Sequence, residues 1–282
     1  MKKPTIGFYR WAIFGLLALP ALLYASEAQN AFKEGVKFYR AGKYKEAVGA
    51  FSRAIKVSPK ADEAYNNRGL SYFKLGQIDA AIKDYDEALK LNPKLTDAYF
   101  NRGNARSAEK QYERALADFD EVLKLDPKTP TAHRQRGLVY NELSRFEKAI
   151  ADFNQAQKLD PKDAEIYYSR GLAYRRLGKH EQALKDYSEA IRLAPKNAET
   201  YNNRANVYSL LGRYDEAVRD YDEAVKLDPK NARIYANRGA IKLRQRKNDE
   251  AQKDFKKAVE LEPDLKPKLE PLMATEKAPS QR

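Results

Sequence analysis

Arginine and aspartate recur in this sequence at a spacing that could serve ion pairing or the binding of an anionic ligand. Six arginines lie 34 residues apart, each in an Asn-Arg-Gly triplet or a near variant: Arg68, Arg102, Arg136, Arg170, Arg204 and Arg238. An aspartate follows each arginine 16 residues later: Asp84, Asp118, Asp152, Asp186, Asp220 and Asp254. A planar guanidinium can hold a carboxylate through two parallel hydrogen bonds. The question is whether that carboxylate belongs to the protein or to a ligand.

Catalytic chemistry is poorly represented in the sequence. The chain has no cysteine, which excludes disulfides, thiolate nucleophiles and zinc–cysteine sites. Its two histidines, His133 and His180, occupy positions where other parts of the sequence carry packing residues. No phosphate-binding glycine loop, nucleophile elbow or metal-spaced cluster is present. We therefore expect a protein that is not an enzyme and that needs no cofactor or metal.

The elements that position these residues are pairs of short helices. Counting from Ala28, the chain contains seven units of 34 residues, and each unit closes with a proline. The first apolar stripe of a unit falls at positions 4, 8 and 11, and the second at positions 20, 24 and 27. A turn between the stripes carries glycine in four units, at Gly42, Gly76, Gly178 and Gly212, where a helix-ending residue is expected.

This unit length, these positions and the closing proline resemble the tetratricopeptide repeat, over residues 28–265. The resemblance implies an all-α, right-handed superhelical solenoid of antiparallel helix pairs, with the first helices lining a concave groove. The last unit departs from the pattern, because Lys242, Arg246 and Asn248 replace an aromatic residue, a glycine and a second aromatic residue. Such departures are typical of a capping unit.

The arginines fall at position 7 and the aspartates at position 23, on helix faces that meet. The first unit lacks both and has Glu34 and Ala50 instead. We therefore predict an arginine–aspartate bridge between the two helices of units 2 to 7. On this interpretation the Asn-Arg-Gly triplet belongs to the scaffold and is not a ligand site.

The resemblance also implies that positions 2, 5, 6, 9, 12 and 13 face the groove. Position 6 is often asparagine, whose amide offers a donor and an acceptor to an extended peptide. Apart from position 2, the charge there is mainly basic, with Glu142 the single acid. We predict that the groove binds an extended, partly acidic peptide. The candidate residues are Asn67, Asn101, Asn104, Arg134, Gln135, Tyr168, Arg175, Asn202, Asn203, Asn206 and Asn237. The alternative is that these amides are simply tolerated on a solvated face.

Other partners remain to be weighed. The net charge of +13 is compatible with nucleic acid or an anionic surface, but the basic run Lys242–Lys247 is typical of a solvated helix. The heat-shock cochaperone type of groove requires lysine at position 5, which no unit has. We expect a protein or peptide partner, with nucleic acid less favoured. A second possibility is assembly or self-association through the ends or the convex face, and the sequence indicates no particular oligomeric state.

The termini have a different character. Residues 1–25 combine a basic start with an apolar run and a small-residue context at Ala25, as in an export signal. The uncharged run Trp11–Ala25 has 15 residues, fewer than the ~20 of a membrane-spanning helix. We expect an exported protein, periplasmic or secreted, or one anchored to the membrane by this segment alone. At the other end, residues 266–282 are expected to give a short end cover followed by a disordered tail.

Overall fold

The computed structural model of the chain describes residues 26–274 and is helical almost throughout, with no strand in that range. The expected export signal and the expected disordered tail lie outside the described residues. A first helix covers residues 26–40. It is followed by α2 (Tyr44–Val57), α3 (Asp62–Lys74), α4 (Ile78–Leu91), α5 (Thr96–Ala108), α6 (Tyr112–Leu125), α7 (Pro130–Glu142), α8 (Phe146–Leu159), α9 (Ala164–Arg176), α10 (His180–Leu193), α11 (Ala198–Leu210), α12 (Tyr214–Leu227), α13 (Ala232–Arg244), α14 (Asn248–Leu261), η1 (Pro263–Leu265) and α15 (Lys266–Met273).

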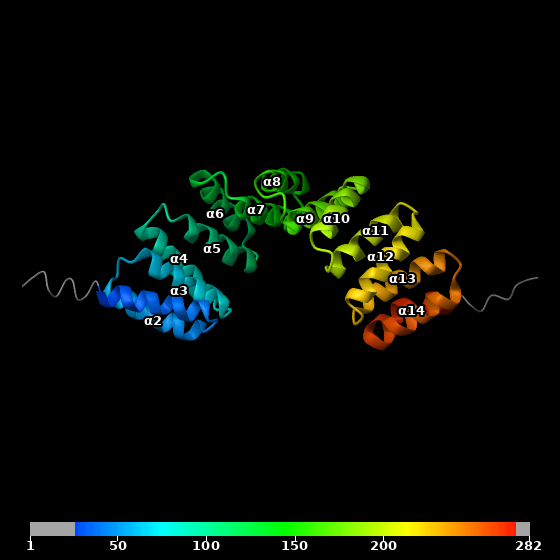
Figure 1. The fold of residues 1–282 in the computed structure, drawn as a ribbon, viewed down its shortest axis with the longest axis horizontal. Coiled ribbons are helices and arrows are strands. Elements are labelled where there is room, and N and C mark those ends of the chain that lie inside the picture. Colours follow the sequence, from blue (N-terminus) through cyan, green and yellow to red (C-terminus); the bar gives the residue numbers. More distant parts are fainter. Residues whose placement is uncertain (1–25, 275–282) are drawn as a thin grey trace, which may run out of the picture. The chain divides into compact units, whose positions relative to one another are not determined.

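The helices pack as consecutive pairs, each made of the first and second helix of one sequence unit (Figure 1). The described residues form two compact parts, which divide between Val139 and Tyr140. In the first part α3 packs on α4 and α5 on α6, and in the second α9 packs on α10, α11 on α12 and α13 on α14. The all-α fold of stacked helix pairs predicted from the 34-residue period is confirmed.

One left-handed residue ends the first helix of every unit, at position 15. The four predicted turn glycines, Gly42, Gly76, Gly178 and Gly212, have φ between +71° and +73°. The other three units place Lys110, Ser144 and Arg246 there, with φ of 58°, 55° and 62°. A side chain with a Cβ is strained in this region, so the geometry is set by the repeat even where glycine is missing.

Replacing Lys110 with glycine is therefore expected to stabilise the protein. The left-handed conformation costs a residue with a Cβ about 1 kcal/mol that glycine does not lose, and Lys110 is exposed, so no packing is removed. Urea denaturation followed by far-UV circular dichroism would measure the gain. The reverse change, Gly76→Lys, should destabilise by a similar amount, and a loss of stability in Lys110→Gly would contradict the interpretation.

In each helix pair, an aromatic ring of the second helix packs against a small residue of the first helix. Phe51, Tyr85, Phe119, Tyr187 and Phe255 at position 24 are fully buried. They pack against the glycines at position 8, where an added Cβ would lie 2.6 to 2.9 Å from a ring carbon. The missing side chain is what allows the two helices of a pair to approach.

The second part of the chain ends in α15, which covers the outer side of α14. Leu269 is buried there, and Leu272 and Met273 pack beside it against the cluster that contains Phe255. Gln252 donates hydrogen bonds to the carbonyl oxygens of Leu272 (3.5 Å) and Met273 (3.2 Å), at the end of α15. Position 21, which Gln252 occupies, is aliphatic in the other six units. The amide thus satisfies helix-end carbonyls that no further repeat would cover.

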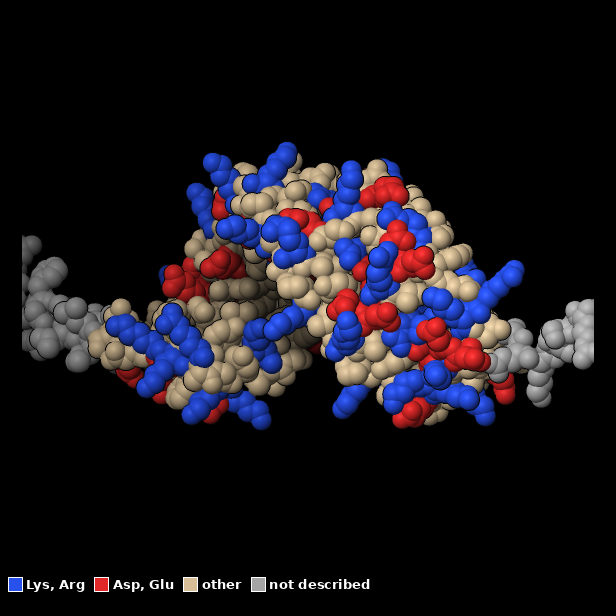
Figure 2. Space-filling view, turned by 45° about the vertical axis from the view of Figure 1, so that its right-hand side comes forward, with Lys and Arg blue, Asp and Glu red and all other residues tan. Residues whose placement is uncertain are grey.

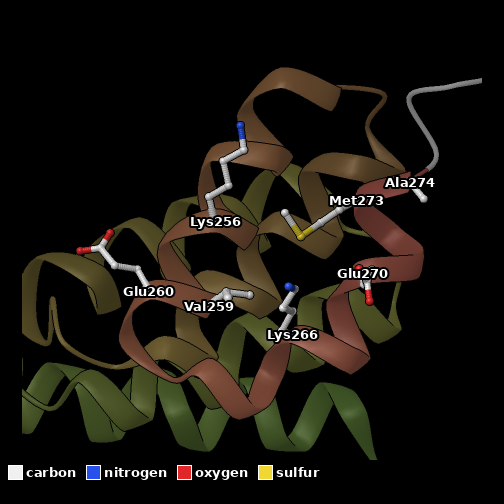
Figure 3. A pocket seen from close by; sticks show the side chains of 7 residues that line it. All are labelled: Lys256, Val259, Glu260, Lys266, Glu270, Met273 and Ala274. Carbon is white, nitrogen blue, oxygen red and sulfur yellow. The ribbon is translucent and has the colours of Figure 1, made fainter.

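A cavity of about 560 Å³ lies between α14 and α15 (Figure 3). The charged side chains around it comprise two lysines and two glutamates, and Val259 and Met273 contribute apolar surface. The formal charges of these lining side chains therefore sum to zero.

Candidate functional site

The predicted arginine–aspartate bridge is present in both parts of the chain. In the second part, Arg170 donates from Nε to Asp186 Oδ2 (2.8 Å) and from Nη2 to Oδ1 (2.7 Å). Equivalent two-pronged contacts join four of the other five pairs at 2.6 to 3.2 Å: Arg68 with Asp84, Arg102 with Asp118, Arg204 with Asp220 and Arg238 with Asp254. The carboxylate partner of each of these arginines is thus supplied by the protein.

Each arginine also reaches back to the preceding unit, a contact that the sequence reasoning missed. Its Nη1 atom donates to a side chain at position 25 of that unit, 16 residues earlier, at 2.6 to 3.0 Å. The acceptors are Ser52, Asp86, Asp120, Asn154, Ser188 and Asp222. The seventh unit, which no arginine follows, has Lys256 at this position. The available signal was a serine, asparagine or aspartate at position 25 in the six units that precede an arginine.

The arginines are therefore held between three helices, and their electrostatics follow from burial. Arg170 is 8% exposed and Asp186 6%. Burial raises the pKa of the Asp186 carboxyl above its ordinary value, while the hydrogen bond and the charge of Arg170 oppose the shift. For Arg170, burial lowers the pKa, but the hydrogen bond and the charge of Asp186 more than offset it, so the pKa is raised. The guanidinium stays charged and is occupied by the scaffold.

The predicted groove asparagines form bonds between neighbouring first helices. Asn101 donates to Asn66 Oδ1 (3.0 Å) in the first part of the chain. In the second part, Asn237 donates to Asn202 Oδ1 (3.2 Å) and Asn203 donates to Tyr168 Oη (3.1 Å). In every case position 6 of one unit bonds position 5 of the unit before it. The amides are therefore fixed in orientation by the stacking of the repeats.

The side-chain oxygens of Asn101, Asn203 and Asn237 are not used in these bonds between repeats. Within residues 26–274, no hydrogen bond is accepted by Oδ1 of Asn101, Asn203 or Asn237. The Tyr168 hydroxyl, which accepts the hydrogen bond from Asn203, in turn donates to Glu199 Oε1 (2.7 Å). Burial raises the pKa of the Tyr168 phenol, and the hydrogen bond to Glu199 adds to the shift. Tyr168 therefore remains a donor, and the amide oxygens remain acceptors.

Most of the other candidate residues contact neighbouring groups of the protein, and two of them, Asn104 and Gln135, make no side-chain hydrogen bond within the described residues. Asn67 donates to the carbonyl oxygen of Glu63 in its own helix (2.8 Å), and Asn206 accepts from Tyr221 Oη (2.6 Å). Arg175 lies near the buried Tyr187 phenol, where burial raises the phenol pKa and the arginine charge opposes the shift. Arg134 is half-buried in α7. In the described part of the chain, Asn104 and Gln135 make no hydrogen bond through their side chains. All eleven candidates lie on first helices.

Two tyrosines at position 24 allow the effect of a hydroxyl hydrogen bond on the stability of the protein to be measured. Tyr221 bonds Asn206, whereas the Tyr85 hydroxyl is buried and has no hydrogen-bond partner within residues 26–274. Tyr85→Phe is expected to leave stability unchanged or to raise it by about 1 kcal/mol, because a desolvated, unsatisfied hydroxyl is removed. Tyr221→Phe should lower stability by about 1 kcal/mol. Thermal unfolding of the two variants would measure the difference, and a clear loss in Tyr85→Phe would show that its hydroxyl has a partner.

Two further types of feature can be examined in the described residues, a metal-binding cluster and a membrane-spanning helix. Among residues 26–274, no group of three or more histidine, aspartate or glutamate side chains could hold a metal ion. None of the described helices is long and apolar enough to cross a membrane.

A polar hollow of about 330 Å³ lies between the starts of α11 and α13, lined by Glu199, Asn202 and Arg233 among others. Figure 2 shows lysine and arginine side chains at many points of one face, with acidic side chains between them.

The fold and the amide-lined first helices define an all-α repeat protein of stacked helix pairs. Models of the tetratricopeptide repeat match residues 62–95, 96–129, 198–231 and 220–253, and a TPR repeat model matches residues 35–76, 137–178 and 171–212. The chain therefore belongs to the tetratricopeptide repeat family. Proteins of this fold act as protein-interaction scaffolds.

Solved structures agree with the fold. A tetratricopeptide repeat protein from Parabacteroides merdae ATCC 43184 is 23% identical, with a TM-score of 0.65, over 88% of this chain and 98% of that one. TTC0263, a thermophilic TPR protein of Thermus thermophilus, is 28% identical, with a TM-score of 0.51, over 64% and 98%. YrrB, described as a TPR protein with an unusual peptide-binding site, is 22% identical, with a TM-score of 0.55, over 64% and 93%. A comparison with curated proteins gave no match.

Proposed function

We propose that this protein is a noncatalytic interaction scaffold that binds an extended, partly acidic segment of a partner protein on the face formed by its first helices. The observation that carries the proposal is the set of interlocked amides. Their N–H groups are used between repeats, and their oxygens accept no hydrogen bond within the described residues. An extended peptide presents backbone N–H groups along its length, so fixed acceptors can bind it at little cost in side-chain entropy.

The charge of this face supports the acidic character of the partner. Arg134, Arg175, Arg176 and Arg244 occupy groove positions, while Glu142 is the one acid at positions 5, 6, 9, 12 and 13. In contrast to the position 7 arginines, the exposed Arg176 and Arg244 form no ion pair within the described residues. Complementary charge on a ligand would steer its association and select against basic segments. YrrB, a structural neighbour, is described as having a peptide-binding site.

The start of the sequence supports a proposal about the compartment in which the protein works. We propose that the protein works outside the cytoplasm, as an exported chain or one held at the membrane by residues 1–25. The basic residues Lys2, Lys3 and Arg10 precede the apolar run, which is the orientation that places the following chain on the far side. The partner would then be another envelope or secreted protein.

The alternative of assembly through the ends is disfavoured by the described residues. In units 2 to 7, positions 3 and 10 are buried, but in the first unit they are the exposed Asn30 and Lys37. At the other end, α15 covers α14. A polar first face and a covered last face are typical of capping units, which stop further stacking.

Site-specific photo-crosslinking would test the proposal. A photoreactive residue is placed at Asn104, a groove position without a side-chain hydrogen bond, and in a matched variant at Lys124, an exposed residue on the second helix of the same unit. We expect a partner to crosslink from position 104 and not from 124, through an acidic segment identified by mass spectrometry. Crosslinking from 124 alone would move the site to the other face, and crosslinks to a second copy would support self-association.

A further inference from the structure

The first helix, residues 26–40, carries a row of cations that no acid neutralises. Lys33, Lys37 and Arg40 follow one another at i, i+4 and i+7, and together with Phe32 and Val36 they line a hollow of about 430 Å³. None of the three cations forms an ion pair within the described residues. Figure 2 shows lysine and arginine side chains gathered at the left of the described part of the chain.

The second helices show the opposite arrangement. There, basic residues pair with an acid three positions away: Glu87 with Lys90, Glu121 with Lys124, Glu189 with Arg192, Glu223 with Lys226 and Lys257 with Glu260. The acids close to the row on the first helix are few. Glu34 is engaged by Arg53 at 2.5 Å, and Glu27 lies at the exposed start of the helix. The row on the first helix therefore carries a local excess of positive charge, whereas these basic residues of the second helices are paired with acids.

The first helix is exposed on the side where later units meet a preceding repeat, and Lys37 of the row lies on that side. It is the first described helix of the array, and its exposed Asn30, Glu34 and Lys37 occupy the positions that later units turn toward a preceding repeat. In the sequence it begins directly after the uncharged run Trp11–Ala25.

We infer that this face of the first helix, formed by Lys33, Lys37 and Arg40 with Phe32 and Val36, binds a phospholipid bilayer with anionic headgroups. The cations would contact phosphate groups, and the partly buried Val36 would lie beside them at the level of the headgroups. Phe32 supports this face from below, because its ring packs against Phe51 with the ring centroids 5.6 Å apart. The contact would hold the repeats close to the membrane surface, whether or not the N-terminal segment is cleaved. Phe32, Lys33, Val36 and Arg40 occupy groove positions 5, 6, 9 and 13 of the first unit, so the inference gives this end of the groove face a second ligand. It does not require the amide contacts of the later units.

Vesicle co-sedimentation tests the inference on the chain from residue 26 onward. This part retains all seven repeats, and repeat arrays are stabilised by contacts between neighbouring units. It also removes the apolar segment, which would bind any bilayer. The probes are vesicles of phosphatidylglycerol and phosphatidylcholine in equal parts, and vesicles of phosphatidylcholine alone. The variant carries Lys33→Gln, Lys37→Gln and Arg40→Gln. The matched control carries Lys230→Gln, Lys247→Gln and Lys253→Gln, three exposed lysines of the second part of the chain that lie outside the groove positions, with the same loss of charge. Circular dichroism checks that all are folded.

We expect binding to the anionic vesicles only, roughly 100-fold weaker partition for the first-helix variant, and near wild-type partition for the control. Binding should weaken as salt is raised, because the headgroup charges are screened. Absence of binding to anionic vesicles, or equal losses in both variants, would overturn the inference. So would preferential binding of an oligoglutamate peptide, lost in the first-helix variant, since it would assign the same cations to an acidic protein segment.

Discussion

Replacing Asp186 with alanine is expected to lower the free energy of unfolding by about 3–5 kcal/mol, because the buried guanidinium of Arg170 would lose its carboxylate. Both side chains are under 10% exposed. Arg170 would keep its contacts with Asn154 and Gln157, which are neutral and cannot balance the charge. Denaturant unfolding followed by far-UV circular dichroism would measure the loss.

A double-mutant cycle separates the ion pair from the volume that is removed. Arg170→Met together with Asp186→Leu should be markedly more stable than the sum of the single changes predicts, because no unpaired charge remains. The exposed pair of Glu189 and Arg192 in the same helix serves as the control, and its loss should have little measurable effect. If Arg170 and Asp186 behave additively, the bridge does not act as a unit.

Replacing Gly171 with alanine is expected to destabilise the protein by about 1–3 kcal/mol, and valine should destabilise it more. A Cβ at this position would lie 2.8 Å from Cε1 of Tyr187, a ring that is fully buried and cannot move aside. The two helices of the unit would have to separate, which would also stretch the contact between Arg170 and Asp186. Thermal unfolding of the variant would measure the effect.

The chain offers a matched control for this substitution. Gly49 lies inside the helix α2, where an added Cβ would meet nothing within 4 Å. Gly49→Ala should therefore raise stability by about 0.5–1 kcal/mol, because alanine is the better helix former. In the sixth unit Ala205 already lies at position 8, so the repeat can be built around one methyl group. Stabilisation by Gly171→Ala would show that the fifth unit has similar room.

The scaffold and the candidate site are connected through the arginines. Arg68, Arg102, Arg170, Arg204 and Arg238 each join two helices of their own unit to the second helix of the unit before it. For three of these neighbouring pairs, amide bonds also join the first helices. Both sets fix the spacing of one repeat relative to the next. A groove whose repeats are held in register can present its acceptors without ordering them at the moment of binding.

The sequence by itself determined the fold class, the unit boundaries and the arginine–aspartate bridge. The 34-residue period, the small residue at position 8 and the paired charges at positions 7 and 23 are all local patterns, and a repeated local pattern admits few ways to bury its apolar stripes. The turn glycines also identified a left-handed residue, which Lys110, Ser144 and Arg246 adopt without the glycine signal.

Only the tertiary structure decided which polar groups serve the scaffold and which are free. The contact from each arginine to the preceding unit, and the bond from Asn203 to Tyr168, join residues of different repeats. Their geometry depends on how the units stack, and a list of residue types does not contain it. For the same reason the sequence grouped all the groove asparagines together, whereas stacking engages the N–H groups of Asn101, Asn203 and Asn237 and leaves their oxygens free.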